Sequence, residues 1–414
     1  MAQLCLEDGT RIEGEPFGAL TDVEGEVVFT TNMTGYCESL TDPSFRGQIL
    51  VFTYPLIGNY GVPSEELNEW GFSQNFESET VQVRGVIVAQ LSDSYSHHAA
   101  VSSLDNWLKR HGVPGITGVD TRMLTKKLRE EGVTGGRMMQ KEDVADDLKA
   151  ESRKPKAETQ SKYEIRNTKY EVLYPRGHLV SQVSCTVPIT YEPTVTSNPS
   201  PSPNQRPEPF TILAYDCGMK RGILRSFLKR GVRVVRVPWD FALDAYRGPL
   251  DGIFMSNGPG DPKDCKPTIT AIQRAIERNI PTFGICLGNQ LMALAVGGDT
   301  FKMKYGHRGA NQPCVELLCK DGSVCERGKQ RCIITSQNHG YAVSDTLPAE
   351  WDVWFRNAND GTVEGIRHTS GRFFAVQFHP EASPGPEDAG YLFEEFLGVL
   401  ERERTGVVAV AGVS

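Results

Sequence analysis

One cysteine stands where it could act as a nucleophile. Cys286 lies within Gly284-Ile285-Cys286-Leu287-Gly288, after the apolar run 280–285 and before a helix-like segment. This order is typical of a nucleophile elbow, with sulfur in place of a serine oxygen. The glycines permit a sharp turn, and the start of a helix favours the thiolate, the form that attacks a carbonyl carbon. Because most cysteines are small buried core residues, this interpretation depends on a nearby base.

A candidate base lies downstream of the cysteine. The apolar run 373–378 predicts a buried strand, and His379-Pro380-Glu381 follows it directly. Pro380 cannot donate a ladder hydrogen bond, so His379 is expected at the strand's carboxyl end, where open α/β sheets bind ligands. Glu381 could then hold the imidazole tautomer, as the acid of a triad does. A histidine here could instead be a structural hydrogen-bonding residue, but the order Cys…His-x-Glu predicts a triad of Cys286, His379 and Glu381.

A glycine-containing loop is predicted at the same edge of the sheet. The apolar run 252–255 leads into Ser256-Asn257-Gly258-Pro259-Gly260-Asp261-Pro262. Such a turn exposes backbone N–H groups, and we expect those of Gly260 and Leu287 to stabilise the oxyanion of an attacked carbonyl. A phosphate-binding turn is the alternative, although the third glycine of a dinucleotide fingerprint is missing. A plain tight turn is the remaining explanation.

The bulk composition argues against several classes of protein. The 414 residues are 39% hydrophobic and 23% charged, which fits a globular chain of two domains. The net charge of −8 and the lack of a basic stripe argue against nucleic-acid binding. No apolar run reaches the ~18 residues that span a bilayer, and the first residues lack a signal-peptide pattern. We therefore expect a cytoplasmic protein, or a mitochondrial one if a transit peptide has been removed.

The cysteines are not distributed like those of a disulfide scaffold. The chain has ten of them, a density that suits reduced thiols in a cytosol-like compartment. A group with His307 nearby raises the alternative of a zinc site, namely Cys314, Cys319, Cys325 and Cys332. Their irregular spacing lacks the C-x-x-C pairs of structural zinc sites, so we expect no metal.

A proline-rich segment at 191–209 marks the clearest domain boundary, because it cannot build a core and should run extended. We expect an amino-terminal domain at 1–190, this linker, a second domain at 210–402, and a tail or a linker to something larger at 403–414. The charged segment 141–169 predicts a surface helix with a mobile loop.

The two domains differ in the order of their predicted elements. The first is expected to be α+β, with strands at 4–6, 26–30, 49–53 and 86–89 and helices at 101–111 and 121–131. The second alternates strands and helices: strands at 212–215, 232–237, 252–255 and 280–285, and helices at 219–229, 268–278 and 392–400. This alternation predicts a doubly wound, mostly parallel sheet with helices on both faces.

The elbow, the Gly-Pro-Gly loop and His379-Pro380-Glu381 together resemble the class I glutamine amidotransferases, which carry a Cys-His-Glu triad. The amino-terminal half is similar to the small subunit of carbamoyl phosphate synthetases in Leu6-Glu7-Asp8-Gly9-Thr10, Gly25-Glu26-Val27-Val28-Phe29, Leu40-Thr41-Asp42-Pro43-Ser44, Thr53-Tyr54-Pro55-Leu56-Ile57-Gly58-Asn59-Tyr60-Gly61 and Gly118-Val119-Asp120-Thr121-Arg122. Two further stretches look more like the animal-type fused synthetases of the pyrimidine pathway, Pro238-Trp239-Asp240 and Asn357-Ala358-Asn359-Asp360-Gly361.

The resemblance implies a glutaminase that supplies ammonia to a carbamoyl phosphate synthetase. Cys286 would attack the side-chain amide of glutamine to form a thioester. His379 would protonate the leaving ammonia and then activate water, while Glu381 orients His379. Glutamine would be held by Ser44, Gly258, Gly260, Leu287, Gln290, Asn338, Gly340 and Tyr341. Because Ser44 precedes the linker, the resemblance implies a pocket at the junction of the two domains.

The implied partner is a large synthetase subunit or a fused synthetase domain. This chain lacks a Gly-x-x-x-x-Gly-Lys-[Ser/Thr] loop, so ATP and Mg²⁺ are expected on the synthetase portion and no cofactor is expected in this chain. The pathway, whether pyrimidine or arginine and urea synthesis, stays open.

Asn289 departs from the family pattern, since many glutamine-dependent members carry histidine there. Ammonia-dependent relatives also carry asparagine but have lost the cysteine, so the retention of Cys286, Leu287 and Gln290 favours glutamine hydrolysis. The alternative is a non-catalytic regulatory or assembly domain with a vestigial triad. A third hypothesis changes the recipient of ammonia, as in anthranilate, GMP or CTP synthesis, and the amino-terminal domain argues against it.

Overall fold

The computed structural model describes residues 1–140, 177–194, 208–317 and 330–406. The surface helix predicted at 141–169, most of the predicted linker and the end of the predicted tail lie outside the described residues. The chain forms two compact units. The first contains Met1–Thr41, Phe45–Glu66 and Glu79–Gly177, and the second contains Asp42–Ser44, Leu67–Ser78 and His178–Ser414.

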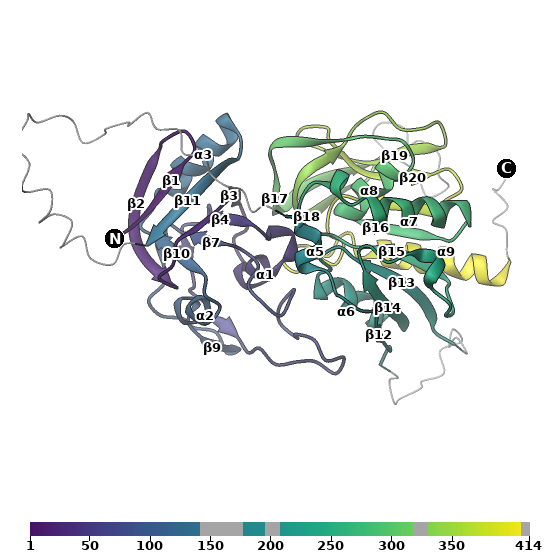
Figure 1. The fold of residues 1–414 in the computed structure, drawn as a ribbon, viewed down its shortest axis with the longest axis horizontal. Helices are drawn as coiled ribbons and strands as arrows, with labels where there is room; N and C mark the ends of the chain where they lie inside the picture. The colour runs from purple at the N-terminus through teal and green to yellow at the C-terminus, as the bar shows by residue number, and fades with distance from the viewer. Residues whose placement is uncertain (141–176, 195–207, 318–329, 407–414) are drawn as a thin grey trace, which may run out of the picture. The chain divides into compact units, whose positions relative to one another are not determined.

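The first unit is built on a closed barrel, which Figure 1 shows in purple and blue. Its strand order is β1 (Ala2–Leu6), β11 (Thr134–Gln140), β3 (Val23–Thr30), β4 (Gln48–Phe52), β7 (Gly85–Ile87), β10 (Pro114–Thr117) and β2 (Arg11–Gly18). Pairing is parallel from β3 through β4 and β7 to β10, and antiparallel elsewhere. The α+β class is as predicted, whereas the closure of the sheet was not predicted.

Short elements complete the first unit. Helices α1 (Tyr36–Thr41), α2 (Leu104–Arg110) and α3 (Thr121–Glu131) accompany the barrel, with the strand pairs β5 (Leu56–Ile57) with β8 (Gln90–Leu91) and β6 (Val62–Pro63) with β9 (Ala100–Ser102). Helix α3 has the predicted bounds because Asp120 caps it, accepting a hydrogen bond from the Met123 N–H at 2.8 Å, and Gly132 ends it.

The second unit contains the predicted doubly wound sheet. Its parallel strands lie in the order β14 (Val232–Pro238), β13 (Phe210–Asp216), β15 (Gly252–Met255), β16 (Thr282–Ile285) and β21 (Phe373–Val376). Successive residues of a strand point to opposite faces, so each strand serves two cores. One core packs α6 (Arg221–Lys229) and α9 (Tyr391–Thr405) on one face, and the other packs α7 (Lys266–Glu277) and α8 (Leu287–Ala295) on the opposite face.

Antiparallel strands extend this sheet at both edges, a feature that was not predicted. β12 (Ile189–Tyr191) pairs with β14, so Tyr191 belongs to a strand although it opens the predicted linker. At the other edge the order continues through β20 (Val363–His368), β18 (Cys332–Val343), β17 (Thr300–Glu316) and β19 (Trp351–Asn357). Smaller elements of this unit are α5 (Leu179–Val183), η2 (Leu243–Ala245) and η3 (Pro262–Asp264), while η1 is Pro43–Phe45.

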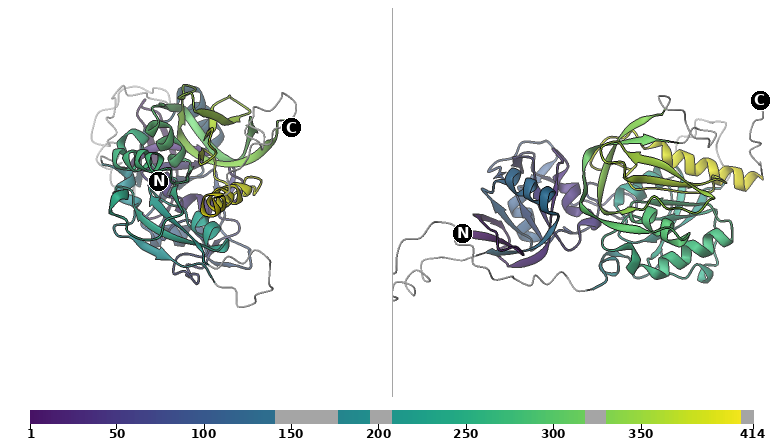
Figure 2. Two further views of the ribbon diagram at one scale, coloured as in Figure 1. Left: turned by 90° about the vertical axis from the view of Figure 1, so that its right-hand side faces the viewer. Right: turned by 90° about the horizontal axis from the view of Figure 1, so that it is seen from above.

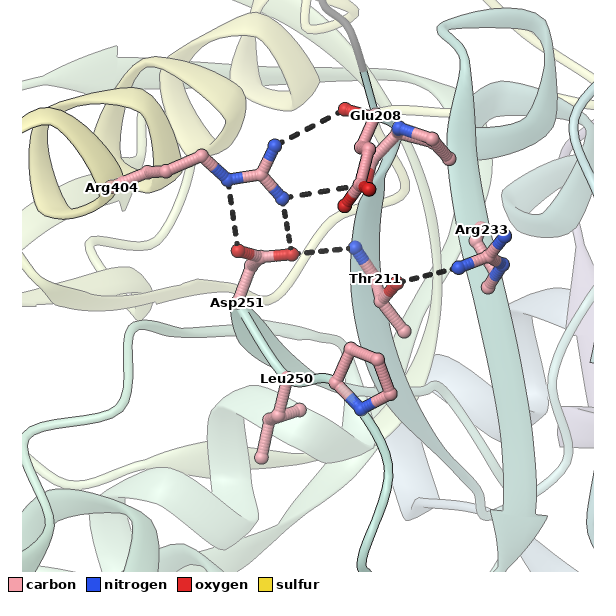
Figure 3. Close-up of a pocket in the computed structure, with 8 residues that line it drawn as sticks. Glu208, Thr211, Arg233, Leu250, Asp251 and Arg404 are labelled. Atoms are coloured by element: carbon pink, nitrogen blue, oxygen red, sulfur yellow. Dashed lines mark hydrogen bonds and ion pairs between the residues drawn. The ribbon is translucent and has the colours of Figure 1, made fainter.

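Helix α9 runs beyond its apolar stripe, which ends at Leu400, and reaches Thr405. Figure 2 shows the helix in yellow. Its last turn is held by Arg404, whose guanidinium pairs with Asp251 at 2.7 Å, donates to the carbonyls of Glu208 and Pro209, and covers the Phe210 ring. This cluster borders a pocket of about 490 Å³ at the amino ends of β13 and β15 (Figure 3). Residues 403–405 are therefore helical rather than a tail.

None of the helices within the described ranges is long and apolar enough to cross a membrane.

Candidate active site

Cys286 occupies the turn between strand β16 and helix α8, as predicted. Its backbone has φ 55° and ψ −101°, a conformation that non-glycine residues rarely adopt and that stores strain. Strand pairing holds the turn, because the Cys286 N–H donates to the carbonyl of Val376 at 2.8 Å. The Leu287 N–H stands at the first helical position, where an N–H has no carbonyl partner within its own helix.

The two glycines of the elbow are required by close approach. An ideal Cβ on Gly284 would lie 2.8 Å from the carbonyl carbon of Gly288. One on Gly288 would lie 2.9 Å from the Cβ of Met255 and nearer still to the Met255 carbonyl oxygen. Any side chain here would push α8 away from β15 and β16. The glycines thus allow helix and strand to pack closely directly beneath the thiol.

His379 and Glu381 are joined within the same protein interior. His379 Nδ1 lies 2.6 Å from Glu381 Oε1, and both side chains are almost fully buried. The His379 N–H donates to the carbonyl of Ser336 at 2.8 Å, which fixes the backbone after β21. Within the described residues His379 Nε2 has no direct hydrogen-bond partner. The thiol of Cys286 is nonetheless one of the groups that stabilise the imidazolium, so we take Nε2 as the atom that faces the cysteine.

The charges of this pair support each other. Burial by itself would lower the pKa of His379, but the charge of the Glu381 carboxylate, the nearby Cys286 thiol and the hydrogen bond to Glu381 outweigh it and raise the pKa to about 10. Burial would likewise raise the pKa of Glu381, but Lys220 and His379 outweigh it and lower the pKa to about 2. The arrangement thus favours an imidazolium beside a carboxylate.

Lys220 is a buried member of this site that the sequence did not reveal. Its Nζ lies 3.0 Å from Glu381 Oε1 and donates to the carbonyl of Ala382 at 2.8 Å. Burial by itself would lower the pKa of Lys220. The nearby carboxylates, of which Glu381 has the largest effect, outweigh burial and raise the pKa to about 12. Lys220 immediately precedes α6, and no spacing pattern connects it with Glu381 in the sequence.

Several residues predicted to hold glutamine converge around Cys286. The Cys286 thiol lies 3.6 Å from the backbone oxygen of Asn338. Gln290 donates from Nε2 to the carbonyl of Tyr341 at 2.9 Å. Gly258 is close to Leu287, since a Cβ on it would lie 2.9 Å from Leu287 Cδ2.

Gly340 and Gly260, the other two glycines predicted to hold glutamine, have different surroundings. Gly340 lies on β18 between Asn338 and Tyr341. Gly260 has φ +91°, and the nearest atoms to a Cβ there would belong to Leu179 rather than to the elbow. Gly340 is therefore linked to the elbow by its strand neighbours Asn338 and Tyr341. Gly260 is linked to it only as part of the loop that contains Gly258.

Ser44 packs within the second unit, together with Asp42. Asn338 donates from Nδ2 to Asp42 Oδ2 at 2.8 Å, and Asn257 donates from Nδ2 to the Ser44 hydroxyl at 3.0 Å. Asp42 therefore fixes the amide of Asn338, a role that the sequence did not suggest. The only hint of Asp42 in the sequence is the turn-forming order Asp42-Pro43-Ser44. In this turn Asp42 Oδ1 accepts a hydrogen bond from the Ser44 N–H at 2.9 Å.

A group of polar residues lies on the neighbouring strands β17, β18 and β20. His307 Nδ1 lies 3.1 Å from Glu364 Oε1, and His307 Nε2 lies 2.8 Å from Asp360 Oδ2. His339, Glu364 and His307 offer ligand atoms within 4.8 Å of one another. Because both nitrogens of His307 face carboxylates, an imidazolium explains this cluster without a metal.

The cysteines of the zinc alternative do not join this cluster in the described part of the chain. Cys314 is buried and approaches Thr335 and Gln337, whereas Cys332 is exposed. Cys319 and Cys325 lie outside the described residues.

Comparison with known proteins identifies the family. Residues 4–138 match the family "Carbamoyl-phosphate synthase small chain, CPSase domain", and residues 213–399 match "Glutamine amidotransferase class-I". The carbamoyl phosphate synthase small chain of Pyrococcus furiosus is 44% identical over 400 residues, which cover 96% of this chain and 97% of that protein. The multifunctional protein CAD of Squalus acanthias is 45% identical over 410 residues, which cover 98% of this chain but only 16% of that protein.

A third relative belongs to the same group. The arginine-specific carbamoyl phosphate synthase small chain of Chaetomium globosum is 43% identical over 400 residues, which cover 96% of this chain and 77% of that protein. Relatives with these names span nearly the whole chain. The two family matches correspond to the two units of the fold, except that Asp42–Ser44 and Leu67–Ser78 lie within the first match but belong to the second unit. The chain therefore belongs to the carbamoyl phosphate synthase small chain family and carries a class I glutamine amidotransferase domain.

Proposed function

We propose that this chain hydrolyses glutamine through a cysteine thioester and passes the ammonia to a carbamoyl phosphate synthetase, either a separate large subunit or a fused domain. The observation that carries the proposal is the position of Cys286 at a strained elbow, in the same interior as the hydrogen-bonded His379–Glu381 pair. The family match supplies the substrate class.

The proposed first step is attack of the Cys286 thiolate on the side-chain carbonyl carbon of glutamine. The N–H of Leu287, and from the loop that of Gly260, would stabilise the oxyanion. His379 Nε2 would then give its proton to the nitrogen, so that the C–N bond breaks and ammonia leaves as the thioester forms. The Glu381 carboxylate holds His379 Nδ1 and keeps Nε2 directed at the reaction.

The second step releases glutamate. Neutral His379 takes a proton from water, the hydroxide attacks the thioester carbon, and the C–S bond breaks to restore the thiolate. The chemistry needs no metal or nucleotide in this chain, and ATP and Mg²⁺ are assigned to the synthetase. Ser44, Gly258, Gln290, Asn338, Gly340 and Tyr341 complete the proposed glutamine pocket.

Asn289 is compatible with this proposal because it is held in place by the same partner as Gln290. It is fully buried and donates from Nδ2 towards Gln377 Oε1 at 3.4 Å, and Gln290 donates to the same oxygen at 3.1 Å. Asn289 is thus part of a hydrogen-bonded group with Gln290 and Gln377.

Substitution of the nucleophile tests the proposal. Cys286→Ser should abolish glutamine hydrolysis, and the holoenzyme should still make carbamoyl phosphate from ammonia. Cys332→Ser is the matched control, because Cys332 is exposed and lies outside the site. Glutamine turnover by the Cys286→Ser protein would refute the assigned nucleophile.

A labelling experiment gives an independent test. A glutamine analogue with a chloroketone in place of the amide should alkylate Cys286 alone, and excess glutamine should protect it. Peptide mass spectrometry reads the result directly. Scattered labelling of other thiols, or a lack of protection, would favour the non-catalytic alternative.

A further inference from the structure

A segment from the first half of the chain forms part of the second unit. Leu67–Ser78 packs with His178–Ser414, and Phe72 belongs to the core beneath α6. The side chain of Arg225, on α6, holds the segment by donating to the backbone carbonyls of Ser73 at 3.1 Å and Phe76 at 3.3 Å. The guanidinium of Arg221 lies 6.0 Å from the Phe72 ring centre. This segment is fixed to α6 at several points.

Glu77, near the end of the segment, is fully buried at the amino terminus of α6. Its Oε2 accepts a hydrogen bond from the Gly222 N–H at 2.8 Å, and its backbone oxygen accepts from the Arg221 N–H at 3.0 Å. Its Oε1 forms an ion pair with Arg225. A carboxylate at this point satisfies helix N–H groups and complements the helix dipole.

Glu381, the acid of the proposed triad, also lies close to the amino terminus of α6. A Cβ built on Gly222 would lie 3.0 Å from Glu77 Oε2 and 3.2 Å from Glu381 Cγ. Gly222 therefore lies beside both buried glutamates, and a side chain there would crowd each of them. Lys220, two residues earlier, bonds to Glu381 and interacts electrostatically with Glu77.

The site thus contains a chain of alternating charges, of which Arg225 is partly buried and the others are almost fully buried. It runs from Arg225 through Glu77 and Lys220 to Glu381 and His379. The single charge of Lys220 interacts with both Glu77 and Glu381. A change in the charge of Glu77 therefore changes how strongly Lys220 attracts Glu381.

We propose that Glu77 is a positioning residue for the glutaminase triad, which acts through Lys220 to set how firmly Glu381 holds His379. The proposal rests on the function proposed above. Glu77 does not touch glutamine. Its negative charge keeps Lys220 from drawing Glu381 away from the imidazole, and it supports the imidazolium by its own field.

The direction of the effect follows from the signs of the charges. Loss of the Glu77 charge makes the site more positive, so both a proton on His379 and a proton on Cys286 are bound less tightly. Loss of the Arg225 charge makes the site more negative and has the opposite effect. The charged and titratable groups that face these residues are Asp42, Lys220, Arg221, Cys286, His339 and Glu381.

The test compares Glu77→Gln with Arg225→Gln in the full chain. For each protein the rate at which iodoacetamide alkylates Cys286 is measured against pH by peptide mass spectrometry, and kcat and KM for glutamine are measured over the same range. We expect the apparent pKa values to fall by about 0.5–1 unit in Glu77→Gln and to rise by a similar amount in Arg225→Gln. Glu69→Gln, an exposed acid on the same segment, should leave the profiles unchanged.

Opposite shifts separate positioning from structural damage, because a loosened fold would move both variants in the same direction or lower kcat without moving the profiles. Superimposed pH profiles, or shifts of the same sign in the folded proteins, would overturn the proposal. Iodoacetamide reacts with a thiolate whether or not glutamine is a substrate. A wild-type protein without glutamine turnover would therefore refute the proposed function, while the alkylation profiles would still decide the role of Glu77.

Discussion

Replacement of Gly288 by alanine tests the packing that supports the elbow. The added methyl group would lie 2.9 Å from the Cβ of Met255, with the Met255 carbonyl oxygen closer still. Ordinary contacts between such atoms are near 3.5–4 Å, so α8 must move away from β15 by roughly 1 Å. No flexible side-chain end is available to give way, because the obstacle is the backbone of a central strand.

The displacement has two expected consequences. Overpacking of this kind destabilises a protein by about 1–3 kcal/mol. Cys286 and the Leu287 N–H move with the start of α8, and a 1 Å misplacement of reacting groups lowers rates by about 10²-fold. We therefore expect kcat/KM for glutamine to fall by about two orders of magnitude, mainly through kcat.

Gly398→Ala provides the matched control. It introduces the same methyl group within helix α9, where the nearest atom is the flexible end of Arg402 at 3.5 Å. Alanine is the better helix former, so this variant should be more stable by about 0.5–1 kcal/mol and fully active. The assays are denaturant unfolding and steady-state glutaminase kinetics. Wild-type stability and wild-type kcat/KM in Gly288→Ala would refute the claim that close packing at this glycine places the nucleophile.

Three further predictions concern strain and charge. Cys286→Gly should be inactive yet more stable than Cys286→Ala by about 1 kcal/mol, because glycine relieves the strained backbone; equal unfolding midpoints would contradict this. The stabilisation that Glu381→Gln removes should be largest between pH 4.5 and 6.5, the ordinary pKa values of the two groups: the lowered pKa of Glu381 loses its contribution towards pH 2, and the raised pKa of His379 loses its contribution towards pH 10. A difference that does not change with pH would count against the ion pair. Burial lowers the pKa of His307, but its hydrogen bond to Glu364 and the neighbouring carboxylates outweigh this and raise it, so the stability lost in His307→Gln should be greater at pH 6 than at pH 9 in unfolding experiments, and the reverse order would be inconsistent with an imidazolium.

Local patterns predicted the elements that carry the chemistry. The bounds of β15 and α3 agree with the prediction because each is set by residues close in sequence, such as the Asp120 cap. The elbow was equally visible, since Gly284 and Gly288 flank Cys286 in the sequence, although the atoms that exclude a side chain at Gly288 belong to Met255 on β15. The roles assigned to Cys286 and its partners stay predictions, while their placement near one another is a finding of the structure.

Features that depend on contacts between residues far apart in the sequence could not be predicted from it. Closure of the barrel joins Leu6 to Gly136, a register that no local periodicity specifies. Lys220 looked like an ordinary charged residue of the helix predicted at 219–229, because its partner Glu381 lies far away in the sequence, after β21. Asp42 was passed over for the same reason, although its neighbour Ser44 was named from the family resemblance.

The assignment of Asp42–Ser44 and Leu67–Ser78 to the second unit has a consequence for dissecting the protein. A fragment that starts at His178 would lack the carboxylate that holds Asn338 and the one that pairs with Arg225, and would leave those polar groups buried without a counterpart. Cleavage of the backbone between the two halves should have a smaller effect, because Asp42–Ser44 and Leu67–Ser78 would still be present to pack in the second unit. The halves should therefore complement each other as a nicked molecule, while the carboxyl-terminal half expressed alone should be poorly folded.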